Sequence, residues 1–174
     1  MISKQRQERQ QKIQSFIQTL EQFRIGKNTA ALSACRRGFL YDDKFLEPYP
    51  FLNRMVPEGK NSEMYYLIAG LYAIHPMNSD GYHYNFGTAM RACYNASNQT
   101  SSFEKRFSTF LQADSDELKR SLFSLIQLAK SKNVPINYAE LLEGLMFWNS
   151  DRNYSKKNWA NSFWSYEAPT SEKQ

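Results

Sequence analysis

Hydrophobic residues recur along most of this chain at steps of three and four positions, the spacing of one face of an α-helix. The first such stripe consists of Ile13, Phe16, Ile17, Leu20 and Phe23. Gly26 is suited to end this helix, and Asn28 or Thr29 can cap the next one. No stretch of any length alternates polar and apolar residues as a β-strand would. The pattern therefore predicts helices almost throughout.

Similar stripes and apolar runs predict further helices downstream. They cover residues 30–39, 63–74, 87–94, 103–111, 116–129, 138–148 and 155–166. The segment 63–74 is apolar nearly all round, so we expect it at the buried centre of the fold. The sequence thus predicts an all-α fold, a single helical bundle of about seven to nine helices.

Breaks in the helical pattern suggest how the chain is organised. Three prolines within residues 48–57 limit any helix there to short pieces. Residues 76–86 lack a helical period and predict a long surface loop, and residues 95–102, all small or polar, predict another. We expect an N-terminal helix over 1–27, a helical bundle domain over 28–167 and a flexible tail over 168–174.

The composition is that of one folded domain with a local excess of positive charge. Its 174 residues are enough to bury a sizeable core, and 15% aromatic residues argue against disorder. Residues 1–60 hold 11 Lys and Arg against 6 Asp and Glu, which gives the whole net charge of +5. A basic face in the second half therefore requires charges to be segregated. Such a face favours nucleic acid or anionic lipid.

The chain carries no signal of export or membrane insertion. Its first residues lack the apolar core of a signal peptide, and the most apolar stretch, Met64–Ile74, is too short to span a bilayer. Two cysteines do not make a disulfide framework. We expect a cytoplasmic, reducing setting and no membrane partner.

Residues suited to catalysis or metal binding are few and scattered. The candidate ligands are Cys35, His75, His83 and Cys93. Their spacings match no zinc pattern, and no glycine-rich phosphate loop is present, so we expect no metal and no cofactor. The acidic cluster at 114–117 lies where a helix start needs a cap and favours negative charge. A small enzyme using Cys93 and His83 is a poorly supported alternative.

Basic doublets on otherwise apolar helices are the feature that points to function. They are Arg36-Arg37, Lys105-Arg106, Lys119-Arg120 and Lys156-Lys157. Phenylalanines that face inward on 103–111 leave Lys105 exposed and place Arg106 beside the core. On the next helix, Arg120 points away from the core with Lys119 at its shoulder. Antiparallel packing of the two helices would line a groove with cations, which Arg91 and the last doublet could extend.

Paired cations of this kind suit a phosphate backbone, and arginine can fork onto phosphate oxygens. The alternatives are that each doublet is only a solvated helix face, or that the cations hold protein partners. The loop aromatics Tyr82, Tyr84 and Phe86 can stack on unpaired bases or anchor the loop in the core. A helix-turn-helix regulator is disfavoured, since no short glycine turn joins two suitable helices.

Five segments, taken in order, resemble a known family. They are Ala34–Gly38, Asn85–Arg91, Phe103–Asp114, Leu118–Leu122 and Leu141–Trp148. Their order and spacing are similar to those of the CasB family, the small subunit of the type I-E CRISPR surveillance complex, Cascade. The resemblance covers roughly residues 28–165. The chain departs from the family before Gly87, where Tyr-Asn-Phe replaces a glycine-rich approach.

The resemblance implies an all-helical, non-catalytic, nucleic-acid-binding subunit. Its implied partners are crRNA, target DNA, the displaced single strand, other Cascade subunits and a second copy of itself. Such subunits contact crRNA and R-loop DNA through basic surfaces and stabilise the target-bound state, while guide pairing reads the sequence. We expect these contacts from Arg36, Arg37, Arg91, Lys105, Arg106, Lys119, Arg120, Lys156 and Lys157. The alternative is a helical scaffold whose basic residues hold protein partners.

Overall fold

The computed structural model describes residues 3–165, and these fold into nine α-helices and one short 3-10 turn. The elements are α1 (Lys4–Ile25), α2 (Thr29–Leu40), η1 (Asp42–Lys44), α3 (Tyr49–Leu52), α4 (Ser62–Ile74), α5 (Phe86–Ala96), α6 (Ser101–Leu111), α7 (Ser115–Ser131), α8 (Tyr138–Met146) and α9 (Tyr154–Trp164). The prediction of an all-α fold is confirmed. None of these helices is both long and apolar enough to cross a membrane. The expected tail at 168–174 lies outside the described residues.

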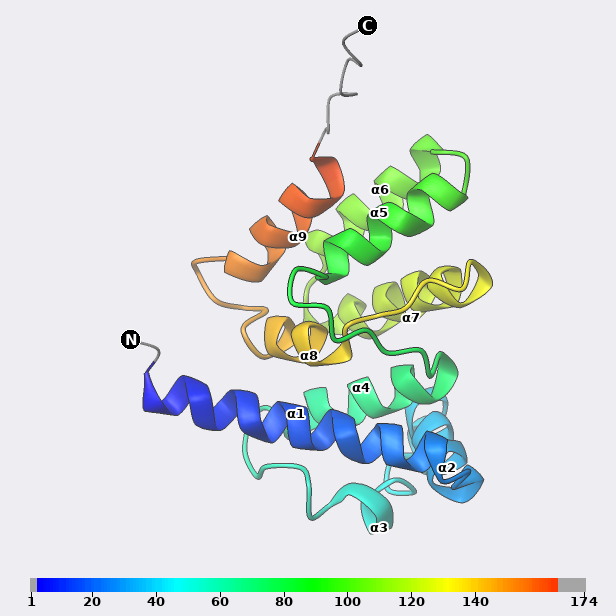
Figure 1. The fold of residues 1–174 in the computed structure, drawn as a ribbon, viewed down its shortest axis with the longest axis vertical. Helices are drawn as coiled ribbons and strands as arrows, with labels where there is room; N and C mark the ends of the chain where they lie inside the picture. The colour runs from blue at the N-terminus through cyan, green and yellow to red at the C-terminus, as the bar shows by residue number, and fades with distance from the viewer. Residues whose placement is uncertain (1–2, 166–174) are drawn as a thin grey trace, which may run out of the picture.

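The helices are stacked in three tiers (Figure 1). In that view α1, α2 and α4 form the lower tier with α3 beneath them, α7 and α8 the middle tier, and α5, α6 and α9 the upper one. Helix α4 joins the lower and middle tiers, since it packs against α2, α7 and α8. Every residue from Ile68 to Ile74 is buried, which confirms the predicted central place of this segment.

The first helix belongs to the same hydrophobic core as the rest. Its residues Ile13, Phe16, Ile17 and Leu20 are buried together with core residues of α4, α7 and α8. The ring of Phe16 meets that of Tyr65 edge-on, with 4.9 Å between centroids. Because α1 packs against both α2 and α8, the apolar stripe read from the sequence is the face that it buries.

Side-chain caps start several of the helices, and those at Asn28 and Asp114 lie where the sequence predicts a cap. The Asn28 side chain accepts from the backbone N–H of Ala31, and Asn137 accepts from Glu140. Asp114 accepts from the N–H groups of Asp116 and Glu117 at 3.0 Å each, so the acidic cluster there is a helix start. The side chain of Glu140 holds α5 and α9, because it accepts from the N–H groups of Phe86 and Trp159.

The predicted loop at 76–86 is present, and hydrogen bonds and a buried aromatic ring hold it against the rest of the fold. The Tyr84 hydroxyl donates to the carbonyl oxygen of Pro135 at 2.7 Å, and Asn137 donates to the carbonyl of Tyr84. Phe86 is fully buried. Tyr84 and Phe86 therefore anchor the loop, whereas Tyr82 is 95% exposed.

Candidate nucleic-acid interface

The cations of α6 and α7 face outward because aromatic and aliphatic residues occupy the inward positions. On α6, Phe103, Phe107 and Phe110 are buried, which turns Lys105 and Arg106 to solvent. On α7 the buried residues are Leu118, Leu122, Leu125, Ile126 and Ala129, and Arg120 is exposed. The two helices pack against each other, which is the condition under which the sequence predicted a groove between them.

A groove of about 460 Å³, open to solvent, lies between these two helices. We call it the α6–α7 groove, and its lining is Ser102, Lys105, Arg106, Thr109, Arg120, Ser121 and Ser124. Three of these residues are cations, four carry hydroxyl groups, and none is acidic. Cations with neighbouring hydroxyl donors are the groups that proteins use to hold phosphate oxygens.

The one ion pair that the groove cations make within residues 3–165 is weak. Arg120 lies 3.9 Å from the carboxylate of Glu117 one turn earlier on α7, and both side chains are mostly exposed. Exposed pairs of this kind contribute little and are screened by salt. The groove cations are therefore available to an external anion.

The Lys119-Arg120 doublet is divided between two surfaces. The Lys119 ammonium lies 4.9 Å from the ring centre of Phe39 and 3.9 Å from Asp42 Oδ1. It thus reaches α2 and η1, whereas Arg120 lines the groove. Helix α2 also carries Arg36, which is exposed, and Arg37, which donates to the carboxylate of Glu47.

The remaining candidates lie on α5 and α9. Arg91 is half-buried, donates to the carbonyl oxygen of Phe163 at 3.2 Å and so links these two helices. The Lys156 ammonium lies 4.3 Å from the ring centre of Trp148, and Lys157 is exposed. The structure thus brings only Lys105, Arg106 and Arg120 together in the α6–α7 groove.

The cysteine and histidine side chains have structural surroundings. Burial raises the pKa of both the Cys35 and Cys93 thiols to about 12, so neither is a thiolate at neutral pH. His75 is buried with Nε2 2.7 Å from the carbonyl oxygen of Val134, to which it donates. His83 is exposed and stacks edge-on against Tyr82. The alternative of a Cys93–His83 enzyme thus lacks an activated nucleophile.

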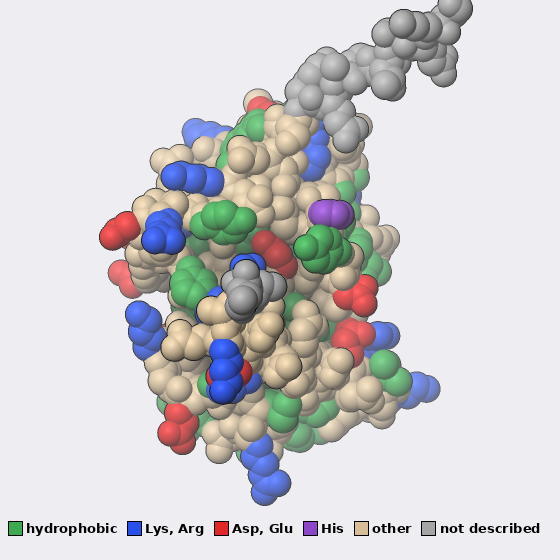
Figure 2. Space-filling view, turned by 60° about the vertical axis from the view of Figure 1, so that its left-hand side comes forward, with side chains coloured by type: hydrophobic (Ala, Val, Ile, Leu, Met, Phe, Trp, Pro, Cys, Tyr) green, Lys and Arg blue, Asp and Glu red, His purple; other side chains and the backbone are tan. Residues whose placement is uncertain are grey.

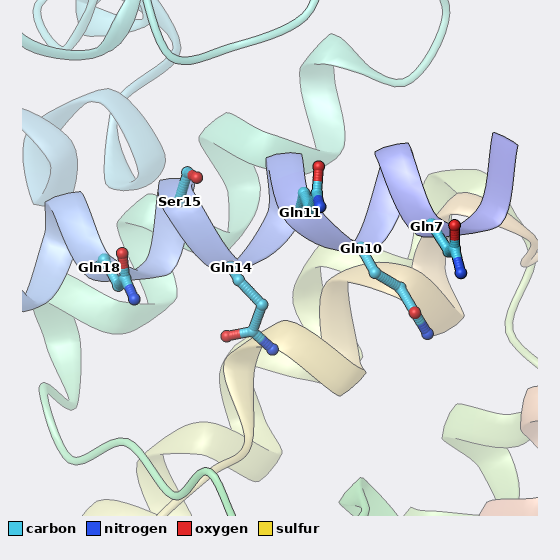
Figure 3. Close-up of a pocket in the computed structure, with 6 residues that line it drawn as sticks. All are labelled: Gln7, Gln10, Gln11, Gln14, Ser15 and Gln18. Atoms are coloured by element: carbon cyan, nitrogen blue, oxygen red, sulfur yellow. The ribbon is translucent and has the colours of Figure 1, made fainter. Parts of the chain in front are cut away.

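A broad depression on α1 differs from the α6–α7 groove because its lining is uncharged. It measures about 670 Å³ and is lined by Gln7, Gln10, Gln11, Gln14, Ser15 and Gln18 (Figure 3). All six side chains are neutral and belong to one helix. The depression is larger than the α6–α7 groove, but its lining has no cation to neutralise phosphate and no titratable group for catalysis.

Sequence reasoning missed three arginines that meet in a second cleft. Arg6 and Arg9 of α1 and Arg152 of the α8–α9 connection line a space of about 620 Å³ beside Glu140 and Glu143. None of the three belongs to a doublet, and more than a hundred positions separate Arg9 from Arg152. No local pattern could have grouped them, because only the packing of α1 on α8 brings them together.

Glu140 is a half-buried acid that lines that cleft. Its oxygens accept from the backbone N–H of Phe86 and from the indole N–H of Trp159. Burial raises the pKa of this carboxyl from 4.5 to about 7, against the lowering effect of those two hydrogen bonds. Glu143, Arg6, Arg9 and Arg152 are the other charged groups that line the cleft.

This pKa shift predicts that the protein loses stability as the pH rises from about 4.5 to 7. In that window the unfolded chain releases the Glu140 proton while the folded state retains it, so ionisation favours unfolding. We expect the free energy of unfolding to fall by between about 1 and 3 kcal/mol, as measured by urea titration at several pH values. Glu140→Gln should flatten the slope over this window. An unchanged slope in that variant would assign the effect to other groups.

The fold and these surfaces define a class: a small all-helical protein that carries separate basic recesses on its surface. Residues 29–164 match the family model of the CRISPR-associated protein Cse2. Because the match spans most of the chain, this protein belongs to the CasB/Cse2 family. The match also agrees with the extent of the resemblance seen in the sequence, roughly residues 28–165.

Individual relatives agree with the family match. The CRISPR-associated protein Cse2 of Thermus thermophilus is 29% identical over 151 residues, covering 84% of this chain and 85% of that protein. The crystal structure of M. ruber CasB is 31% identical, with a TM-score of 0.75 over 88% of this chain and 93% of that one. A chain of a solved CRISPR RNA-guided surveillance complex has a TM-score of 0.73 over 89% and 92%. At 19% identity this last likeness shows the shared fold.

Proposed function

We propose that this protein is a non-catalytic small subunit of a type I-E CRISPR surveillance complex and that it holds a nucleic-acid backbone in the α6–α7 groove. The observation that carries the proposal is the groove itself, with three cations, four hydroxyl residues and no acid among its lining residues. Membership of the CasB/Cse2 family supports the assignment to the complex. The likeness of the fold to a chain of a surveillance complex agrees with it.

The chemistry of the groove is suited to backbone contact without base reading. Binding of phosphates by Lys105, Arg106 and Arg120 releases condensed counterions, which is the main source of sequence-independent affinity. The hydroxyls of the lining serine and threonine residues can position the strand by hydrogen bonds to phosphate or sugar. Sequence would then be read by the guide RNA, and the subunit would stabilise the opened target.

The proposed partners are crRNA, target DNA and its displaced single strand, the other Cascade subunits and a second copy of this chain. Arg36 on α2 and Lys157 on α9 are exposed and would provide further backbone contacts. Arg37 and Arg91 would contribute less, because each already has a partner within the chain. The same holds for Lys156, which lies over the Trp148 ring, and for Lys119, which lies over the Phe39 ring and near Asp42.

Reconstitution of the complex tests this function. A surveillance complex that lacks its small subunit should hold target DNA longer once this protein is added, as measured by the dissociation of a labelled target. The groove triple variant carries Lys105→Glu, Arg106→Glu and Arg120→Glu. It should join the complex, because these side chains are exposed, but should not prolong binding. Equal lifetimes with both proteins would contradict the role of the groove, and failure of the unaltered protein to join would reject the subunit assignment.

A scaffold role is the second candidate, and an exposed apolar region favours it. Residues at the end of α2 and in the segment that follows are each more than a third exposed: Leu40, Tyr41, Phe45, Leu46 and Phe51. Apolar side chains gathered on a surface commonly mark contacts with another protein. If, in such a scaffold, the basic residues held protein partners and no nucleic acid, the groove triple variant would bind oligonucleotides as the unaltered protein does and would release a protein partner in a pull-down.

A further inference from the structure

The cleft between α1, α8 and α9 has both arginine and aromatic side chains in its lining, whereas the lining of the α6–α7 groove has no aromatic residue. It measures about 620 Å³ and lies between the start of α1, the end of α8 and the start of α9. Figure 2 looks onto this side of the molecule, where Lys and Arg side chains lie among acidic, apolar and other polar ones. We call it the α1–α8–α9 cleft.

Two of the three arginines that line the cleft are free to bind a ligand. Arg9 donates to Glu143 Oε1 at 3.1 Å from Nη2 and 3.3 Å from Nε, which neutralises that carboxylate. Arg6 and Arg152 form no ion pair with any residue in 3–165. Glu140 has both oxygens engaged by Phe86 and Trp159. The cleft therefore offers unneutralised positive charge at its rim.

Two aromatic rings flank the same space. Phe147 follows α8 and is 46% exposed, and Tyr154 begins α9 and is 77% exposed. The guanidinium of Arg9 lies 4.8 Å from the ring centre of Phe147 and covers one of its faces. Tyr154 stacks on no other ring within the described part of the chain. A large exposed ring beside free arginines is the arrangement with which proteins hold an unpaired base and its phosphates.

We propose that the α1–α8–α9 cleft binds one unpaired nucleotide of a single strand. Tyr154 stacks on the base, while Arg6 and Arg152 contact the phosphates on either side. Asn158, which lines the same cleft, can hydrogen-bond to the base edge or the sugar. The site differs from the proposed function of the groove, because it requires an unstacked base and not a backbone alone. It can therefore be tested whether or not the groove assignment holds.

Binding of short oligonucleotides by the full chain tests this site. The Tyr154→Ala variant should bind a labelled oligodeoxythymidine about tenfold more weakly, with an unchanged salt slope and unchanged affinity for a duplex of the same sequence. Arg152→Glu should also weaken binding and should reduce the salt slope. Tyr82→Ala is the matched control, since that ring is 95% exposed but does not line the cleft, and its affinity should not change.

Photo-cross-linking locates the base directly. A strand containing 5-iodouridine should cross-link to Tyr154, also in the groove triple variant, which separates this site from the α6–α7 groove. Equal losses of affinity for single strand and duplex in Tyr154→Ala, or no loss at all, would overturn the proposal. So would cross-links confined to other residues. If Tyr154→Ala instead released a protein partner at unchanged oligonucleotide affinity, the cleft would be a protein-docking site and the nucleotide proposal would be wrong.

Discussion

Reversing the three cations of the α6–α7 groove is expected to weaken the binding of single-stranded DNA or RNA by about a hundredfold at low salt. Lys105, Arg106 and Arg120 lie together in a groove with no acidic residue in its lining. Every phosphate of a single strand that a protein neutralises adds about 0.7 to the slope of log affinity against log salt concentration. The groove triple variant should therefore show a slope that is lower by about two, as measured by fluorescence anisotropy over a salt series.

A second triple variant separates the groove from overall charge. Lys4, Lys12 and Lys60 are exposed cations outside the groove, and their replacement by glutamate changes the net charge by the same amount. If the groove is the contact surface, this variant should retain most of the affinity. Equally weak binding by the two triple variants would mean that binding follows the net charge of the protein, and the groove would then have no special role.

Gly87→Ala is expected to lower the free energy of unfolding by about 3 kcal/mol. A Cβ at this position would lie 2.1 Å from the carbonyl oxygen of Trp159 and 2.7 Å from its carbonyl carbon. These are backbone atoms of α9, so no side-chain rotation can relieve the clash. The added methyl group would force apart α5 and α9, which pack closely along their length.

The steric clash and helix propensity predict changes of opposite sign in the free energy of unfolding. Helix propensity alone would make alanine more stable than glycine within α5 by about 1 kcal/mol. Urea unfolding followed by circular dichroism measures which effect dominates. Gly81→Ala is the control, because a Cβ there would meet the Tyr84 side chain at 3.2 Å in a surface loop, and it should cost less than about 1 kcal/mol. A Gly87→Ala protein as stable as the original would contradict the close packing of the two helices.

Local patterns were sufficient to predict most of the fold. The apolar stripe of α1, the buried segment of α4 and the Asp114 cap of α7 were each legible in a few neighbouring residues. Helical periodicity and capping depend on residues three or four positions apart, so short windows contain the information. The proline-rich stretch at 48–57 also behaved as predicted, with only the single turn of α3 forming there.

For the loop at 76–86, local patterns predicted the irregular backbone but not the role of its aromatic side chains. Its lack of period correctly predicted an irregular segment. The sequence left open whether Tyr84 binds bases or anchors the loop, and its bond to Pro135, 51 positions away, decided for the anchor. Local patterns also did not predict the role of Glu140, since its hydrogen bonds to Phe86 and Trp159 involve two other helices.

The sequence by itself determined that the chain is helical, which faces are buried and that Lys105 and Arg120 point to solvent, because each of these follows from spacing on a single helix. Arg106, which the spacing placed beside the core, is exposed in the structure. Only the tertiary structure decided which cations share a surface. It placed Arg120 in the α6–α7 groove, turned Lys119 toward α2 and gathered Arg6 with Arg152 in another cleft. These groupings depend on contacts between helices far apart in the chain, such as the approach of Gly87 to Trp159, and spacing along one helix carries no information about them.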